Sequence, residues 1–406
     1  MKRKHQIVKR VTGAILDNWV FALIIAVLGV ISIGVLLFQL GSLVPGANPA
    51  ESVHITAIKD NQINPLQALV QQPNFLPFTL GLFIMQLFSL ESVSWLRAIS
   101  VVFGLLSVAS VYYIVSRWHT FRVSVFSALL YATSAGLLHV ARLGDERSTY
   151  LLLPLVIAIG LYSKGQKSQI PKFIALGLAG LLVLYLPGTI WIAISLSALY
   201  YRQIITSFNK VSVPIKSIGG SIALIFVGLL TFSFITNPQQ LRLWLGAPAE
   251  SLPALNDFFT QLALVPVQLF AWGPEDPSMW VGTAGIIDIF VTVLFALGCY
   301  SYFYQRKLDR TKFLFVAMFV LILLAALGGP VSVFSLVPFI YIIAATGLAL
   351  LLQQWFTVFP RNPFARGMAI VIIVAAISMS VFYNTHRYFI AWPRTPAVYS
   401  EFTIEQ

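Results

Sequence analysis

Long apolar runs separated by short polar segments make up most of this chain. An apolar bilayer core of about 30 Å is crossed by roughly 20 helical residues. The run at residues 19–40 meets this length, is too long for the apolar part of a signal peptide and lacks a convincing cleavage site, so we expect a retained anchor. Further spans are predicted at residues 97–115, 123–140, 150–163, 173–186, 188–201, 217–236, 280–303, 313–328, 333–354 and 367–383.

One apolar segment, residues 75–90, is short and carries Pro77 near its start. If it crossed the membrane, Arg117 and Arg122 would lie outside, and every later basic loop would change sides. We therefore expect an interfacial helix on the outer face.

The pair 173–186 and 188–201 is also short, and Pro187-Gly188 between its halves forms either a tight turn or a kink. The basic residues Lys172 and Arg202 at its far ends favour two crossings.

These features predict an all-α fold, a polytopic transmembrane helical bundle of about eleven spans. Residues 1–383 form one transmembrane domain with outer loops at 42–96 and 237–279, and residues 384–406 form a short tail outside the cytoplasm. No internal repeat, nucleotide-binding glycine motif or zinc-type cysteine spacing is present in the sequence, so we expect no metal site.

Composition excludes the other protein classes. Hydrophobic residues make up 58% of the 406 residues and charged residues 10%, whereas soluble domains are about 25% charged. A single cysteine excludes a disulfide scaffold. The net charge of +12 would suggest nucleic acid in a soluble protein, but in a membrane protein its placement matters more, and we expect no nucleic-acid partner.

The charges are divided between the two sides of the predicted topology. Positive flanks stay in the cytoplasm, which places the N-terminus of this cell-membrane protein inside. The acidic residues provide a separate indication, because only Asp17 and Asp309 fall inside and Asp288 within a span. Acid–base chemistry is therefore expected at the extracytoplasmic face. The basic residues left on that face are Lys59, Arg97, Arg142, Arg147, Arg242, Arg387 and Arg394.

Two outer segments place acids in unusual surroundings. Glu51 and His54 follow the first span, where an acidic side chain faces either a cavity or only solvent. Glu275 and Asp276 stand between prolines and tryptophans, which suits a rigid turn facing a carbohydrate, although an interfacial tryptophan belt explains the aromatic residues equally well.

A third segment, residues 138–150, combines both charges. If it is helical, Arg142, Asp145, Glu146 and Thr149 share one face. That face would offer a cation for a phosphate and two carboxylates for hydroxyl groups. A surface ion pair at the end of a helix is the alternative interpretation.

The order of these elements resembles the GT-C glycosyltransferase superfamily, specifically bacterial relatives of dolichyl-phosphate-mannose protein mannosyltransferases. The resemblance rests on the first anchor, the acid in the following loop, Trp95-Leu96-Arg97, residues 139–146 and the proline at Val337-Pro338, and it extends over residues 15–355. Two positions depart from that family: Ala50-Glu51 replaces an acidic pair, and Phe334-Ser335 stands where relatives often carry a basic residue.

The resemblance implies a membrane glycosyltransferase, hexosyl- or mannosyltransferase-like, that moves one sugar from a polyprenyl-phosphate donor to a glycan, lipid or protein acceptor by inverting single displacement. Glu51 is then the expected base, with Asp145 and Glu146 as second candidates. No cofactor is required, because an arginine can replace a metal at a single phosphate. The expected phosphate or substrate contacts are Arg142, His54, Arg242, Glu275, Asp276 and Arg394.

Two alternatives come from other functional classes. The first is a transporter or flippase for lipid-linked sugars, which would carry charges deep in broken helices; Asp288 and the Pro187 region are the features that favour it. The second is a non-catalytic protein with this fold, which Ala50 favours.

Overall fold

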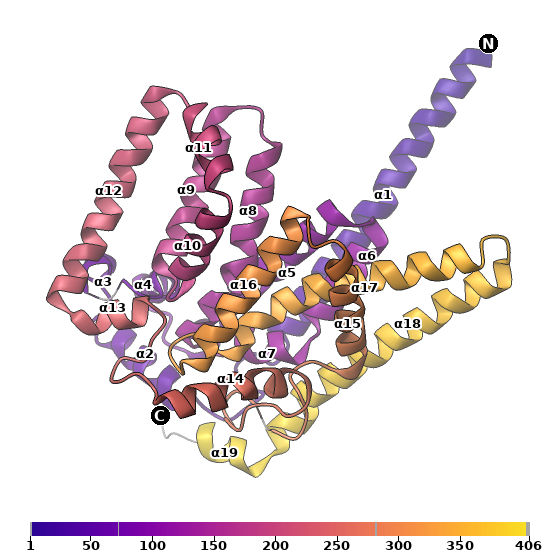
Figure 1. The fold of residues 1–406 in the computed structure, drawn as a ribbon. Coiled ribbons are helices and arrows are strands. Elements are labelled where there is room, and N and C mark those ends of the chain that lie inside the picture. Colours follow the sequence, from indigo (N-terminus) through magenta and orange to yellow (C-terminus); the bar gives the residue numbers. More distant parts are fainter. Residues whose placement is uncertain (1, 72, 281, 403–406) are drawn as a thin grey trace.

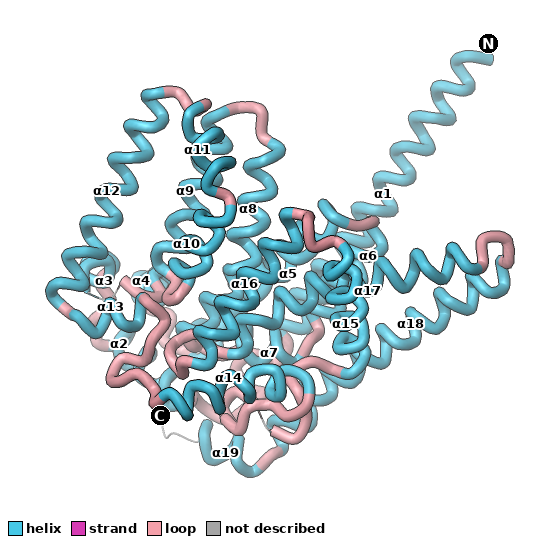
Figure 2. Tube along the Cα trace, viewed as in Figure 1, coloured by secondary structure: helices cyan, strands magenta, loops and turns pink. Residues whose placement is uncertain are grey.

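The computed structural model describes residues 2–71, 73–280 and 282–402, and every regular element within them is helical (Figures 1 and 2). The predicted all-α class is therefore confirmed. The first elements are α1 (Lys2–Leu37), α2 (Pro49–Lys59), α3 (Pro65–Gln71), α4 (Leu76–Leu87), α5 (Val93–Trp118), α6 (Phe121–Ala132), α7 (Ala135–Ala141), the 3-10 helix η1 (Glu146–Leu152), α8 (Leu153–Gly165), α9 (Gln169–Tyr185), α10 (Thr189–Leu199) and α11 (Tyr201–Asn209). They are followed by α12 (Val213–Thr236), α13 (Pro238–Trp244), α14 (Leu255–Phe270), α15 (Ile289–Tyr304), α16 (Asp309–Ala326), η2 (Val333–Leu336), α17 (Val337–Val358), α18 (Pro363–His386), η3 (Arg387–Ala391), η4 (Trp392–Arg394) and α19 (Pro396–Phe402).

Six helical segments in the described part of the chain are long and apolar enough to cross a membrane. The chain is therefore a multi-pass membrane protein. The segments are Trp19–Leu37, α5, Glu146–Gly165, α12, Val333–Val358 and Pro363–Arg394. A seventh is added if α6 and α7, which are bent by 58° at their junction, count as one span.

The predicted count of eleven spans is not confirmed. Helices α9, α10 and α15 contain 17, 11 and 16 residues, and at 1.5 Å per residue they are shorter than a bilayer core of about 30 Å. The predicted span 280–303 is wrong over its first part, because the helix begins only at Ile289, after the cap residue Asp288.

The chain reverses between α9 and α10, which pack against each other. Gly188 has a φ of +75°, a conformation that glycine adopts without steric cost. Its backbone N–H donates to the carbonyl oxygen of Trp244 at 2.8 Å, and the Trp244 indole donates to the carbonyl oxygen of Leu184 at 2.7 Å. These contacts hold a tight turn against α13. A tight turn was one of the two interpretations of Pro187-Gly188 in the sequence.

The connecting segments gather at two ends of the bundle. Figure 1 shows α2, α13, α14 and α19 at one end, here called the α2 end, and the start of α1 together with α11 at the other, the α11 end. The 12-residue helix α4 lies near the α2 end and measures about 18 Å. This length agrees with the prediction of an interfacial helix, and its depth in a membrane stays a prediction.

Residues 384–402, the described part of the predicted tail, continue the fold. Helix α18 runs through His386 and is followed by three short helices, so the predicted boundary at 383 does not coincide with the end of an element. Arg387 donates to the carbonyl oxygens of Ala284 and Gly285 at 2.7 and 2.8 Å. Trp392 and Phe402 are buried. The C-terminal segment is therefore packed into the α2 end.

The core depends on a close approach of α15 and α17. Residues 337–348 of α17 are all buried. A Cβ atom at Gly347 would overlap the carbonyl oxygen of Leu294, and one at Gly298 would overlap that of Ile343. Both positions therefore require glycine, because only a residue without a side chain lets two backbones come this close.

We predict that Gly347→Ala lowers the melting temperature of the purified protein and its yield of folded monomer, because the added methyl group must push the two helices apart. The matched control is Gly160→Ala in α8, where a Cβ meets nothing within 4 Å and alanine improves helix propensity by up to about 1 kcal/mol. Equal melting temperatures for the two variants would contradict this packing.

A second prediction concerns orientation. Ser400 on α19 and Ser207 on α11 are both exposed, at opposite ends of the bundle. In a Cys299→Ala background, a cysteine at position 400 should react with a membrane-impermeant thiol reagent in intact cells, and one at position 207 only after permeabilisation. The reverse pattern would invert the predicted topology.

Candidate functional site

Glu51 is held by hydrogen bonds on the first turn of α2. It forms a reciprocal capping box with Asn48, in which the backbone N–H of Asn48 donates to Oε2 at 3.1 Å. Arg97 of α5 donates from Nε to Oε1 and from Nη2 to Oε2, both at 2.8 Å. The backbone N–H of Gly144 donates to Oε1 at 2.8 Å. The carboxylate is fully buried.

This geometry favours a structural role for Glu51 over its predicted role as a base. A carboxylate has about four acceptor positions, and four donors already occupy those of Glu51. An acceptor hydroxyl would have to displace one of these donors and enter a site that has no exposure to solvent.

Arg97 extends the same contact to three more segments. Its guanidinium also donates to the carbonyl oxygens of Leu40 and Gly46, at 3.2 and 3.1 Å, and its Cζ lies 5.7 Å from the ring centroid of Phe402. The ion pair therefore joins the segment after α1, the loop before α2, α5 and the C-terminal segment. Gly144 completes it, because a Cβ there would collide with Leu96.

Arg142 is buried at the end of α1. It donates from Nη1 to the carbonyl oxygens of Val35 and Leu36, at 2.8 and 3.0 Å, and from Nη2 to that of Phe38 at 2.6 Å. Its Nε donates to the Tyr388 hydroxyl at 3.2 Å. Arginine at a helix C-terminus satisfies carbonyl groups that have no partner within the helix. These contacts favour a capping role over the predicted contact with phosphate.

The predicted helical face from Arg142 to Thr149 does not form. Helix α7 ends at Ala141, and the chain is non-helical until η1 begins at Glu146. The cause is local, since the Gly144 backbone turns inward to Glu51 and Asp145 caps η1, its Oδ1 accepting from the Arg147 N–H at 2.7 Å. As a result the Arg142 side chain does not share a helical face with those of Asp145 and Glu146.

His54 lies one helical turn after Glu51 and its ring contacts Phe78 edge-on, with centroids 5.2 Å apart. Burial lowers the pKa of His54, while the nearby carboxylates of Asp145 and Glu51 oppose this shift. The structure thus brings three predicted site residues to the α2 end, with His54 in its neutral form at neutral pH.

Glu146 and Arg147 face a different space. Together with Glu250, Ser251 and Phe75 they line a cavity of about 510 Å³, here called the polar cavity, whose wall is completed by Leu243, Pro248, Ala249, Gly328, Gly329 and Pro330. Glu146 is exposed. Arg147 lies with its Nε 3.9 Å from Asp145 Oδ2 and is half exposed. The cavity therefore holds a solvent-accessible carboxylate beside a cation.

A second and larger cavity adjoins the first. It has a volume of about 1310 Å³ and is lined mostly by apolar side chains of α10 and α16, and we call it the apolar groove. Its charged residues, Arg242 and Glu250, lie within or after α13, and Ser195 on α10 and Ser251 are also polar. Glu250 and Ser251 also line the polar cavity. Arg242 is exposed and donates from Nη1 to the Glu250 carbonyl oxygen at 2.7 Å.

The remaining predicted site residues line neither cavity. Glu275 is exposed, and Asp276 Oδ1 accepts from the N–H and hydroxyl of Ser278 at 3.0 and 2.7 Å, which stabilises a turn. Arg394 is exposed in the C-terminal segment. Asp288 caps α15 and accepts from Ser380 and Asn384 at 2.9 and 2.8 Å, so its buried charge has structural partners.

Arg147 was predicted as an outer basic residue without a role, and Glu250 was not singled out. Arg147 follows the acidic pair directly, which is a usable signal, but nothing in the sequence near Glu250 indicates that it lines the same cavity as Glu146. No cluster of three His, Cys, Asp or Glu side chains that could hold a metal occurs among the described residues.

Comparison with solved structures identifies a shared fold. The crystal structure of ArnT from Cupriavidus metallidurans in the apo state matches with a TM-score of 0.51 and 13% identity, over 95% of this chain and 76% of that one. The ArnT structure bound to undecaprenyl phosphate matches with a TM-score of 0.51 and 14% identity, over 94% and 76%.

This chain has a GT-C-type fold. No protein-family model and no curated protein matches its sequence. The likeness to ArnT thus confirms the fold that the sequence predicted, while membership of the superfamily and the narrower relationship to mannosyltransferases stay predictions.

The Glu51–Arg97 contact predicts a loss of stability in Glu51→Gln. A glutamine amide turns N–H groups toward the Arg97 and Gly144 donors and leaves a buried cation unpaired, and breaking a buried ion pair costs about 3–5 kcal/mol. We expect a melting temperature several degrees lower. Glu146→Gln, which changes an exposed carboxylate, serves as the control and should melt as the wild type does. Wild-type stability of Glu51→Gln would contradict the structural role.

Proposed function

We propose that this protein is a glycosyltransferase that moves a single sugar from a polyprenyl-phosphate donor to an acceptor at the extracytoplasmic face. The observation that carries the proposal is the junction of the apolar groove with the polar cavity at Glu250 and Ser251. A lipid-linked sugar has the same two parts, a long apolar chain and a polar head. The ArnT structure bound to undecaprenyl phosphate supports this class of lipid.

The apolar groove is the proposed site of the isoprenoid chain. Its wall of α10 and α16 side chains includes Trp191, Phe315 and Phe319 and offers no charge except at Arg242 and Glu250. Burial of apolar surface drives the binding of such a chain. The phosphate is proposed to lie at the polar end of the groove, near Arg242 and the opening of the polar cavity.

Glu146 is the proposed base. It takes the proton of an acceptor hydroxyl as the oxygen attacks the anomeric carbon, and the bond from that carbon to the phosphate oxygen breaks with both electrons leaving on the lipid phosphate. Attack opposite the leaving group inverts the anomeric centre. Glu146 fits this role better than Glu51, because its carboxylate faces a cavity of about 510 Å³.

Arg147 and Arg242 are the proposed partners of the departing phosphate. Both lie on the walls of the joined cavities, and a preorganised cation offsets the negative charge that develops in the transition state. The mechanism needs no metal for this purpose. A hexosyl or mannosyl donor, and a glycan, lipid or protein acceptor, remain parts of the proposal.

The alternative of a non-catalytic protein is favoured by Ala50, which is exposed on α2 and supplies no carboxylate. It becomes the better account if the wild type binds polyprenyl phosphate without turning over any lipid-linked sugar. A transporter is less favoured, because Asp288 is bound by Ser380 and Asn384 rather than facing an open path.

We predict that Glu146→Gln lowers turnover by about 10²-fold or more, the usual contribution of a general base, without changing the melting temperature. The measurement is transfer from a radiolabelled polyprenyl-phosphate sugar in proteoliposomes. Glu275→Gln removes an exposed acid outside both cavities and should retain full activity. Unchanged turnover in Glu146→Gln would refute its assignment as the base.

A further inference from the structure

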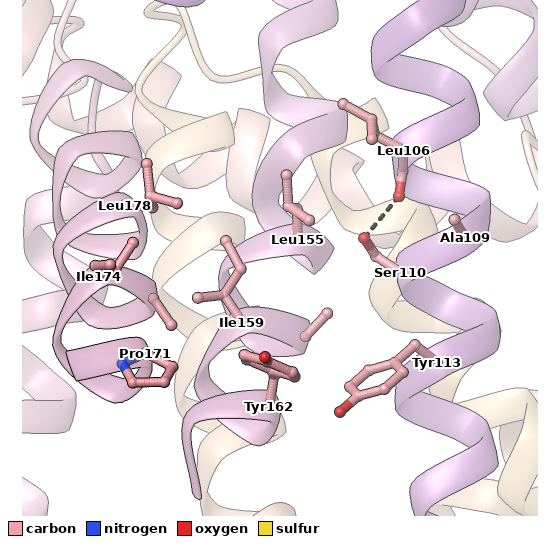
Figure 3. A pocket seen from close by; sticks show the side chains of 12 residues that line it. Leu106, Ala109, Ser110, Tyr113, Leu155, Ile159, Tyr162, Pro171, Ile174 and Leu178 are labelled. Atoms are coloured by element: carbon pink, nitrogen blue, oxygen red, sulfur yellow. Dashed lines mark hydrogen bonds between the residues drawn. The ribbon is translucent and has the colours of Figure 1, made fainter. Parts of the chain in front are cut away.

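A third cavity lies away from the proposed donor site. It is a groove of about 520 Å³ between α5, α8 and α9, here called the tyrosine groove, and Figure 3 shows its side chains. Its lining residues are Leu106, Ala109, Ser110, Tyr113, Leu155, Ala158, Ile159, Tyr162, Pro171, Ile174, Ala175 and Leu178. They belong to the later half of α5, to α8 and to the first ten residues of α9.

The tyrosine groove is apolar along its length and polar at one mouth. Its one serine, Ser110, donates to the Leu106 carbonyl oxygen of its own helix at 2.6 Å and so adds no open polar group. Tyr113 and Tyr162 lie next to each other at the end that also holds Pro171 (Figure 3). Tyrosine prefers such positions because its ring is apolar and its hydroxyl is not.

Cations surround this mouth. Arg117 lies one turn beyond Tyr113, donates to its hydroxyl at 2.9 Å and stacks over its ring with Cζ 4.9 Å from the centroid. Lys164 lies in the last turn of α8, Lys167 lies in the connection that follows, and Lys172 follows Pro171 on α9. All except Lys172 are exposed.

None of these four cations has a described carboxylate as an ion-pair partner, although Asp309 also lies at the α11 end, where its backbone carbonyl oxygen accepts from the Tyr200 hydroxyl. Between residues 98 and 249 the sequence contains only two carboxylates, Asp145 and Glu146, and both lie at the α2 end. The mouth therefore presents uncompensated positive charge at the end of an apolar channel, where a lipid phosphate supplies the missing charge.

We propose that the tyrosine groove binds an anionic glycerophospholipid from the leaflet at the α11 end, with one acyl chain along α5, α8 and α9 and the phosphate beside Arg117 and Lys164. The volume favours a single acyl chain over a polyprenyl chain, because the apolar groove is more than twice as large, at about 1310 against 520 Å³. This site is independent of the proposed sugar transfer.

The test is native mass spectrometry of the full-length protein in detergent, with phosphatidylglycerol and phosphatidylcholine of identical chains added in competition. The wild type should retain phosphatidylglycerol at least tenfold more strongly than phosphatidylcholine. The double variant Arg117→Gln/Lys164→Gln should lose this preference. Ala158→Phe, which fills the groove, should reduce retention of both lipids while leaving the charges in place.

The matched control is Lys307→Gln/Arg361→Gln, which removes one exposed lysine and one exposed arginine on the α15–α16 and α17–α18 connections, outside the helices that form the tyrosine groove. It should keep the wild-type preference. Equal loss of the lipid preference in both double variants would show that the preference depends on overall surface charge, and would overturn the proposal. Displacement of phosphatidylglycerol by polyprenyl phosphate at equal concentration would also overturn it, by showing that the occupant is the donor-type lipid.

Discussion

The α2 end of the molecule depends on a single buried ion pair, Glu51–Arg97. Two charges without solvent are tolerated only when hydrogen bonds satisfy them, and here the backbone supplies the additional partners. Gly144, Leu40 and Gly46 are each held at a fixed distance from the pair. The non-helical break after α7 follows from this requirement, since a continuous helix would keep the Gly144 N–H from reaching Glu51. That break in turn directs Glu146 and Arg147 into the polar cavity.

The charged residues of this end therefore divide into two groups with different physical roles. Glu51, Arg97 and Arg142 are buried and use their polar atoms on backbone groups and on each other. Glu146 and Arg242 are exposed on cavity walls and keep polar atoms for a ligand. A general base must be able to exchange a proton with the acceptor. A buried charge that stabilises the fold must instead be held in place by its hydrogen-bond partners. The proposed mechanism assigns the chemistry to the exposed group accordingly.

Much of the fold was predictable because the membrane imposes it. Apolar length identified the six segments that are long enough to cross a bilayer, but it also predicted spans at α9, α10 and α15, which are shorter. The interfacial position of residues 75–90 was inferred from their length and from the sides of the later basic loops, and it stays a prediction. The sequence prediction missed the start of α15, although Gly282 and Gly285 are unfavourable in a helix and Asp288 is a favoured N-cap residue. There the side chain of Asp288 caps the helix and sets its first residue.

The candidate site was only partly predictable, for a reason that concerns individual residues. The charge pattern predicted most of the acids on one side and marked Glu51, Arg142 and Glu146 as candidate site residues. It could not separate buried from exposed charges, because that depends on which distant backbone carbonyls surround each one. Arg142 donates to a carbonyl oxygen at the end of α1, more than a hundred residues earlier. Glu250 lines the same cavity as Glu146 of η1, across a similar separation in sequence. The local spacing of residues does not indicate such contacts.

The central claim is that a lipid phosphate binds where the apolar groove meets the polar cavity. A cryo-electron microscopy structure of the protein in nanodiscs with added polyprenyl phosphate tests it most directly. The account predicts density for the chain along α10 and α16, with the phosphate within hydrogen-bond distance of Arg242 or Arg147. A phosphate bound to Arg142, or a chain outside the apolar groove, would contradict it.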